Sequence, residues 1–292
     1  MKTVTDMRYE CPNSIEAAVA LLVAEGRGAR VFAGGTDLLV QIKEELTEPS
    51  LLVDIKKIPQ IRAITIGPDD IRVGAAVTGA ELGEHDQLKA LWPGVVEAVE
   101  LIGSNQVQAR ATIGGNLCNA SPAADSVPAL IAAAATVVIT GPGGTRQVPV
   151  REILAGPGQT SLEQGEVVIS IVLPTPRERA GDAYLRFIPR TEMDIAVVGA
   201  GAAVVLNPDG TCAEARLALG AVAPTARLVE AAEEILIGNR LDESTLDALA
   251  KAARESCSPI DDKRGTIEFR TKVAGVLACR VTKIAWQRAE DK

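Results

Sequence analysis

In the first 140 residues, helical spacing of apolar positions alternates with short strand-like runs. Ser14 precedes a run that continues at helical spacing to Val23, and Ala29 to Ala33 then forms a compact β-rich run. The same pattern predicts further strands at 51–55, 71–76 and 136–140, and helices at 91–102 and 127–135, the second beginning near Ser126 and Pro128. Strands and helices therefore alternate, as in an α/β unit.

A different pattern follows residue 176. The stretch 174–179 is rich in proline and charge, which is typical of a domain boundary. Two β-like runs at 196–206 and 212–222 flank the turn sequence Asn207-Pro208-Asp209-Gly210-Thr211 and predict an antiparallel hairpin, with mostly helical sequence from Ala226 onward. We therefore expect two domains, at 1–176 and 177–292.

Composition narrows the possible partners and locations. The net charge of -8 and an aromatic content of 2% disfavour nucleic acid as a partner. Apolar stretches are shorter than the roughly 20 residues that a membrane-spanning helix needs, and residues 1–6 lack an apolar signal core. These features predict a cytoplasmic protein without an integral membrane segment.

Few side chains are candidates for metal binding or acid–base catalysis. The odd set of five cysteines contains no Cys-x-x-Cys pair, so we expect reduced, mostly buried thiols and no metal site. The only histidine, His85, lies in a polar stretch and is expected at the surface, which excludes histidine triads. The pairs Glu44-Glu45 and Glu233-Glu234 are interpreted as solvated helix faces. No catalytic side chain is predicted, so the chemistry is expected to come from a bound cofactor.

Two Gly-Gly turns are the strongest functional signal. They lie in the segments Ala33-Gly34-Gly35-Thr36-Asp37 and Thr112-Ile113-Gly114-Gly115-Asn116. A glycine pair after a strand lets backbone N–H groups approach an anion, so two such loops could hold one dinucleotide. Alone, Gly34-Gly35 could be only a tight turn, and Asp37 only a turn or cap residue. A third motif, Gly199-Ala200-Gly201, lacks the strand–helix–strand context of a dinucleotide fingerprint and is assigned to the hairpin.

Together, several motifs resemble one known family. The second loop continues to Asp125 as Leu117-Cys118-Asn119-Ala120-Ser121-Pro122-Ala123-Ala124-Asp125, and later come Tyr184-Leu185-Arg186, Arg190 with Asp194-Ile195-Ala196, and the segment 258–265. This ordered set is similar to the FAD-binding medium subunit of molybdenum hydroxylases, the xanthine dehydrogenase and aerobic carbon monoxide dehydrogenase family. The resemblance implies an α+β protein with a PCMH-type FAD-binding fold of two α/β subdomains, at about 1–57 and 58–176. It also implies a C-terminal domain with a three-stranded antiparallel sheet and helices.

The resemblance also implies roles for individual residues. Both glycine loops would contact the FAD pyrophosphate, Ser121 and Asp125 would bind the phosphate and ribose end, and Val168 and Arg186 would lie near the flavin. Arg186 would stabilise negative charge on the reduced flavin or the pyrophosphate. Asp125 could instead cap the following helix, and the two roles can coexist.

By the same resemblance, FAD would be the only cofactor of this chain. The molybdenum cofactor and [2Fe-2S] clusters would belong to a large and a small partner subunit, assembled with this chain as a dimer of heterotrimers. The chain would pass electrons from the clusters to NAD, a quinone or oxygen. One alternative is a stand-alone flavin reductase of the UDP-N-acetylenolpyruvoylglucosamine reductase type, which shares the fold and the first loop. Another is a flavin-free interaction protein that has kept only the fold.

Overall fold

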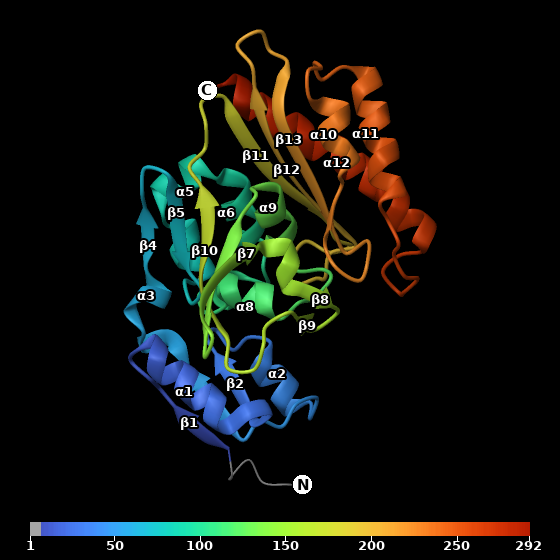
Figure 1. Cartoon of the computed structure of the whole chain (residues 1–292). Helices are drawn as coiled ribbons and strands as arrows, with labels where there is room; N and C mark the ends of the chain where they lie inside the picture. Colours follow the sequence, from blue (N-terminus) through green and yellow to red (C-terminus); the bar gives the residue numbers. More distant parts are fainter. Residues whose placement is uncertain (1–6) are drawn as a thin grey trace.

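The computed structural model describes residues 7–292. Residues 1–6, for which the sequence predicts no signal core, lie outside the described residues. The chain forms three units in a row, and the ends of the described chain lie at opposite ends of the molecule (Figure 1). The N-terminal unit has a parallel sheet in the order β1-β3-β2. Its elements are β1 (Arg8–Glu10), α1 (Ile15–Glu25), the 3-10 turn η2 (Gly26–Gly28), β2 (Ala29–Phe32), α2 (Leu38–Lys43), β3 (Leu51–Asp54) and the 3-10 turn η3 (Ile55–Lys57).

The first predicted helix and strands are confirmed. Helix α1 begins where the Ser14 side chain accepts a hydrogen bond from the backbone N–H of Ala17, at 3.2 Å. Its buried residues Ala18 and Leu22 belong to the same apolar core as the central strand β3, in which all four residues are buried. Strand β2 is an edge strand and ends at Phe32. The first glycine loop, which begins at Ala33, therefore starts at the edge of this small sheet.

The middle unit is built on an antiparallel sheet in the order β4-β5-β10-β6-β7. Its central strand β10 has seven consecutive buried residues. The hydrophobic pattern analysis predicted no strand there, although a run of mostly apolar residues is typical of a strand covered on both faces. Ser170 is the one polar residue of this run. The sheet strands are β4 (Ile64–Ile66), β5 (Asp70–Gly74), β6 (Thr136–Gly141), β7 (Gly144–Pro149) and β10 (Val167–Pro174).

Short helices surround this sheet. The helix predicted at 91–102 is confirmed with narrower bounds, as α6 (Pro93–Glu100), whereas Leu91 ends a separate helix, α5 (Asp86–Leu91). The two helices meet at Trp92. Pro93 has no N–H with which to continue the first helix, but it is well suited to begin the second. The remaining elements are α3 (Pro59–Arg62), α4 (Gly79–Gly83), α5 (Asp86–Leu91), α6 (Pro93–Glu100), α7 (Asn105–Gln108), α8 (Ile113–Cys118), α9 (Ser126–Ala132), the 3-10 turn η4 (Val150–Ile153), β8 (Leu154–Gly156) and β9 (Gln159–Thr160).

The C-terminal unit is an antiparallel sheet in the order β11-β12-β13-β14, with helices α10 to α12 on the face away from the middle unit (Figure 1). The predicted hairpin is confirmed, and the motif Gly199-Ala200-Gly201 lies within its first strand. Three strands are long, and a fourth of two residues extends the expected three-stranded sheet. The elements are β11 (Ala180–Phe187), β12 (Val198–Leu206), β13 (Cys212–Gly220), β14 (Arg227–Leu228), α10 (Ala231–Leu236), α11 (Glu243–Glu255) and α12 (Ile267–Glu290).

Two side-chain expectations need correction. His85 is half-buried rather than fully solvated, because its Nδ1 accepts a hydrogen bond from the N–H of Leu88 and caps α5, at 3.2 Å. Of the five free cysteines only Cys212 is buried, whereas the other four are half-buried. Glu44, Glu45, Glu233 and Glu234 are exposed, as predicted. Glu233 and Glu234 lie on a helix, but Glu44 and Glu45 lie in the turn after α2 and not on a helix face.

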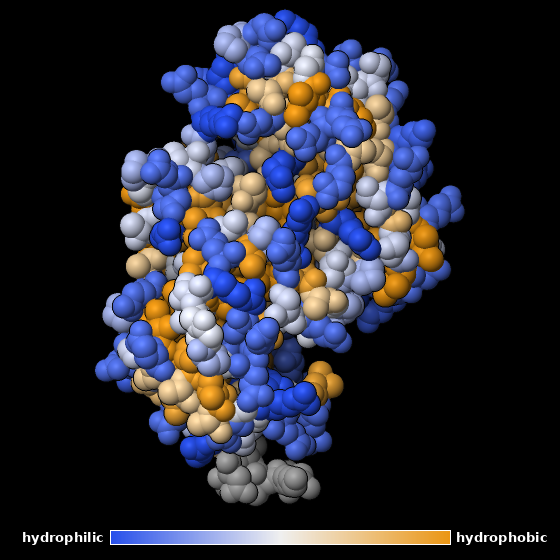
Figure 2. Space-filling view, in the orientation of Figure 1, coloured by the Kyte–Doolittle hydropathy of each residue, from blue (hydrophilic) through white to orange (hydrophobic). Residues whose placement is uncertain are grey.

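Within residues 7–292, no cluster of three or more His, Cys, Asp or Glu side chains could hold a metal ion. No helix in this range is long and apolar enough to cross a bilayer. Polar side chains cover much of the face shown in Figure 2, with apolar patches between them. The surface is indented between the N-terminal and middle units, on the side of α2 and β8–β9 (Figures 1 and 2).

Candidate cofactor-binding site

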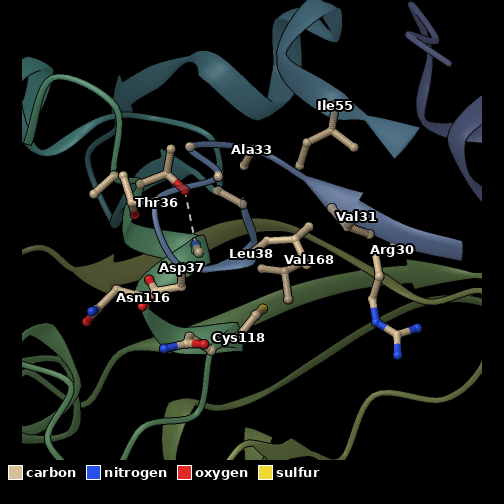
Figure 3. A pocket seen from close by; sticks show the side chains of 18 of the residues that line it. Arg30, Val31, Ala33, Thr36, Asp37, Leu38, Ile55, Asn116, Cys118 and Val168 are labelled. Carbon is tan, nitrogen blue, oxygen red and sulfur yellow. Dashed lines mark hydrogen bonds between the residues drawn. The ribbon is translucent and has the colours of Figure 1, made fainter. Parts of the chain in front are cut away.

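A cavity of about 350 Å³ lies between the N-terminal and middle units. The two glycine loops form adjoining parts of its wall, and β10 contributes a third part (Figure 3). Ten of the fourteen predicted site residues line the cavity: Ala33, Gly34, Gly35, Thr36, Asp37, Thr112, Gly114, Gly115, Asn116 and Val168. The other four, Ile113, Ser121, Asp125 and Arg186, are not part of this lining.

The first loop packs directly against the chain that precedes the second loop. A Cβ on Gly34 would lie 2.1 Å from the carbonyl oxygen of Arg110 and 3.0 Å from the Cα of Ala111. Gly35 has a φ of +75°, and a Cβ there would lie 2.4 Å from Cε2 of Phe32. Both glycines are therefore required by the packing of the loop itself, in addition to any approach of a ligand. Segments almost 80 residues apart in sequence converge at this point.

The backbone donors of the first loop are free. The N–H groups of Gly34, Gly35, Thr36 and Asp37 have no hydrogen-bond acceptor among residues 7–292, and all four residues line the cavity. Backbone N–H groups are strong donors that are normally paired. A run of unpaired donors in residues that line one cavity is suited to the oxygens of an anion such as a pyrophosphate.

The second loop has a different role, because the backbone N–H groups of Ile113, Gly114, Gly115 and Asn116 already donate within the chain. The N–H of Ile113 donates to Val77 at 3.2 Å, and that of Gly114 donates to Ala75 at 3.0 Å. The hydroxyl of Thr112 accepts from the N–H of Gly115 at 3.1 Å and caps α8. The Ile113 side chain is fully buried in the core. The second loop thus forms a wall of the cavity that is held by its own hydrogen bonds and adjoins the free donors of the first loop.

A side-chain hydrogen bond also joins the two units beside the cavity. Nε2 of Gln41, on α2, donates to Oδ1 of Asn119, just after α8, at 3.1 Å. Both residues line the cavity. This bond and the Gly34 contact hold the units together on either side of the loops.

Apolar side chains line the deeper part of the cavity. Figure 3 shows Leu38, Val168 and Cys118 extending toward the same space, and the buried Ile55 belongs to the same lining. Burial raises the pKa of the Cys118 thiol to about 12, so this group is a neutral thiol at physiological pH. Burial also raises the pKa of Asp37. The cavity therefore combines the backbone donors of the first loop with apolar side chains and a neutral thiol in another part of its lining.

Asp125 and Arg186 contact each other. The Arg186 guanidinium donates to Oδ2 of Asp125 at 2.8 Å, and the Tyr184 hydroxyl donates to Oδ1 at 2.9 Å. Asp125 precedes α9 but makes no side-chain capping bond, so the capping interpretation is wrong. Burial raises the pKa of Asp125 to about 6, against the opposing effects of Arg186 and Tyr184. The hydroxyl of Ser121 accepts a bond from the N–H of Ala123, at 3.3 Å.

Several cavity residues were not predicted. Cys118 and Asn119 line the cavity and belong to the second-loop motif, but no sequence feature assigns them a role. Gln41 and Ile55 carry no motif signal at all, because an amide on a short helix and a buried isoleucine are ordinary in any α/β unit. Only the folded arrangement shows that they meet the glycine loops.

Two family models match almost the whole chain. A model described as the FAD binding domain in molybdopterin dehydrogenase matches residues 5–176, and one described as the CO dehydrogenase flavoprotein C-terminal domain matches residues 183–285. The chain belongs to the FAD-binding medium subunits of the molybdenum hydroxylases. The resemblance found in the sequence is thereby confirmed, and this medium subunit is an oxidoreductase subunit.

Relatives of known sequence agree with this membership. The medium subunit is similar to the carbon monoxide dehydrogenase medium chain of Hydrogenophaga pseudoflava, with 36% identity over 281 residues, covering 96% of this chain and 97% of the relative. It is also similar to the xanthine dehydrogenase FAD-binding subunit of Escherichia coli O157:H7, with 32% identity over 273 residues and 93% of each chain covered.

Solved structures share the fold of this medium subunit. A chain of carbon monoxide dehydrogenase from Hydrogenophaga pseudoflava matches with a TM-score of 0.93 and 35% identity, over 97% of this chain and 98% of that one. A chain of quinoline 2-oxidoreductase from Pseudomonas putida 86 matches with a TM-score of 0.89 and 30% identity, with the same coverage.

Proposed function

We propose that this chain binds one FAD in the cavity between its two glycine loops and serves as the electron-transfer flavoprotein of a molybdenum hydroxylase. Electrons would arrive from [2Fe-2S] clusters on a small partner subunit and leave to an external acceptor. The observation that carries this proposal is the row of four cavity-lining N–H groups, Gly34 to Asp37, that have no acceptor within residues 7–292. Such a row suits a pyrophosphate, which both halves of a dinucleotide share.

The surrounding residues fit the rest of the cofactor. We assign the pyrophosphate to the segments 33–37 and 112–116, and the flavin side to Val168. Ser121, Asp125 and Arg186 would complete the site next to this cavity. Arg186 supports the assignment because its side chain is only 6% exposed and its Nε has no hydrogen-bond partner among the described residues. A buried donor of this kind is costly unless a further acceptor meets it.

When bound, FAD supplies the ability to accept electrons singly and release them as a pair. The chain itself would bind the cofactor, orient it and exclude water. Val168 and Ile55 provide apolar surface, and the neutral Cys118 thiol adds no charge beside them. Since this role requires no proton transfer by a side chain, we assign no catalytic acid or base.

The relatives support the proposal that this chain is one subunit of a larger enzyme. The Hydrogenophaga protein is a medium chain and the Escherichia protein is an FAD-binding subunit, so each is one part of a larger enzyme. We propose that this chain likewise assembles with a large molybdenum-cofactor subunit and a small [2Fe-2S] subunit as a dimer of heterotrimers. The substrate would bind to the large subunit. A stand-alone reductase is not favoured, because the Hydrogenophaga and Escherichia relatives, which match over 93% or more of their length, are dehydrogenase subunits.

Two measurements test this function. The purified full chain, stripped of flavin, should quench the fluorescence of added FAD with a stoichiometry of one, and alone it should hydroxylate no substrate. Co-purification with its partner subunits should yield flavin, iron and molybdenum in one complex. A chain that takes up no FAD, or one that hydroxylates substrate without partners, would contradict the proposal.

A further inference from the structure

Lys56 lies behind the first glycine loop, outside the cavity lining. Its Nζ donates to the carbonyl oxygen of Ala33 at 2.8 Å and lies 4.1 Å from the centroid of the Phe32 ring. We propose that Lys56 is a positioning residue that fixes the first loop in its FAD-binding conformation without touching FAD. This inference rests on the proposed function.

The geometry of the peptide bond explains how a carbonyl anchor acts on a donor. A trans peptide is planar, and its C=O and N–H point in opposite directions. The carbonyl of Ala33 and the N–H of Gly34 belong to the same peptide unit, so holding the carbonyl on Lys56 aims the N–H away from Lys56. Gly34 N–H is the first of the four free donors that line the cavity. Lys56 therefore orients the start of this donor row.

The second anchor is the Phe32 ring. Phe32 occupies the space beside Gly35, where a Cβ would lie 2.4 Å from the ring. An ammonium group over an aromatic face is attracted by the ring electrons. By holding Phe32, Lys56 supports the loop at Gly35 as well as at Ala33.

Lys56 is itself held in place by a buried carboxylate. Oδ1 of Asp54 lies 2.8 Å from Nζ of Lys56 and accepts from the backbone N–H of Lys56 at 2.9 Å. The Tyr9 hydroxyl also donates to Asp54, which is only 4% exposed. Burial alone would raise the pKa of Asp54, but the bonds from Lys56 and Tyr9 hold it below its ordinary value. The carboxylate is thus charged at neutral pH and fixes the ammonium group.

The test compares FAD affinity in the full chain. Lys56→Met should weaken FAD binding about 10- to 100-fold, the effect expected for a lost hydrogen bond from a charged group. Lys56→Arg keeps a donor and a cation over the ring and should restore most of the affinity. Lys57→Met, at the exposed neighbouring position, is the matched control and should bind FAD as the wild type does.

Salt dependence separates positioning from direct contact. If Lys56 acts only through the loop, the dependence of the FAD dissociation constant on ionic strength should be the same in Lys56→Met and in the wild type. A weaker dependence in the variant would show that Lys56 binds the phosphates directly, and would overturn the proposal. Equal FAD affinity in Lys56→Met and wild type would also overturn it.

A wild-type chain that binds no FAD would contradict the proposed function. This outcome is distinct from the outcomes that test the role of Lys56.

If Lys56→Met does not fold, the FAD affinity of Lys56→Gln is compared with that of the wild type instead. Glutamine keeps a hydrogen-bond donor but lacks the charge. An intermediate loss of affinity is expected there, and unchanged affinity overturns the proposal.

Discussion

Arg186 and Asp125 form a buried ion pair, 2.8 Å between Nη1 and Oδ2, that joins the C-terminal sheet to the segment leading into α9. Both side chains are at most 10% exposed. The bond from the Tyr184 hydroxyl to the same carboxylate strengthens this connection. Because β11 supplies both Tyr184 and Arg186, a single strand links the C-terminal unit to the region of the proposed cofactor site.

Loss of one partner of the Asp125–Arg186 ion pair should lower the free energy of unfolding. Asp125→Ala leaves the Arg186 guanidinium buried without its counter-charge, and we expect a loss of about 3–5 kcal/mol in the free energy of unfolding. The double variant Asp125→Ala/Arg186→Met removes both charges and should be more stable than Asp125→Ala. Urea denaturation of the flavin-free chain measures both values. If the double variant loses as much free energy of unfolding as Asp125→Ala and Arg186→Met together, the two residues are not energetically coupled.

Gly34 offers a test of the convergence of the two loops. Gly34→Ala places a Cβ 2.1 Å from the carbonyl oxygen of Arg110, so the first loop must move away from the second. We expect FAD affinity to fall at least 10-fold, measured by flavin fluorescence, together with a lower melting temperature. Gly143→Ala is the control, because nothing lies within 4 Å of a Cβ there. Equal behaviour of the two variants would contradict the tight contact between the loops.

Much of the fold could be predicted from local patterns. The capping serine of α1, the runs that became β2, β3 and β6, and the hairpin β12–β13 all follow from rules acting over a few residues. Trp92-Pro93 shows where periodicity misleads, since apolar spacing continues through a proline that separates two helices. The missed strand β10 has no alternation because it is buried throughout, so its signal is a run rather than a period.

The candidate site was less predictable than the fold. Glycine pairs marked both loops, but the sequence could not show that the donors of one loop are free while those of the other are bound to Val77 and Ala75. Nor does any sequence motif indicate that Lys56 contacts the carbonyl of Ala33. Such contacts join segments that are distant in sequence, and no local pattern encodes them.

Asp182 predicts a pH dependence of stability. It lies on β11, and its carboxyl accepts from the N–H of Val95 at the start of α6, at 3.2 Å. Burial raises the pKa of Asp182 from 3.8 to about 7, although Arg288 acts in the opposite direction. The native state therefore holds a proton between about pH 4 and pH 7 that the unfolded chain releases, and this contribution to stability is lost as the pH rises through 7.

Asp182→Asn removes this titration while keeping an oxygen that can accept from Val95. Between pH 5 and pH 7.5 the melting temperature of the variant should decline less than that of the wild type, by a few degrees, as followed by circular dichroism. Asp247→Asn, at an exposed position on α11, should leave the wild-type profile unchanged. Parallel profiles for Asp182→Asn and the wild type would show that Asp182 does not titrate in this range.

Arg270, on α12, should be essential for the stability of the C-terminal unit. It is 4% exposed, and its Nη1 donates to the carbonyl oxygens of Val197 and Ala221, at 2.7 and 3.3 Å. Its Nη2 donates to Asp262 at 2.7 Å. One planar guanidinium thus joins the segment before β12, the turn after β13 and the loop before α12.

A lysine has a single ammonium group and cannot span these three acceptors, so Arg270→Lys should lower the free energy of unfolding by about 2–4 kcal/mol despite its unchanged charge. Thermal denaturation of the flavin-free chain measures this loss. The matched substitution Arg280→Lys, on the same helix but with no hydrogen bond from its side chain within residues 7–292, should be nearly neutral. If Arg270→Lys left the free energy of unfolding unchanged, the positive charge alone would account for the role of Arg270. The three hydrogen bonds of its guanidinium would then not be needed.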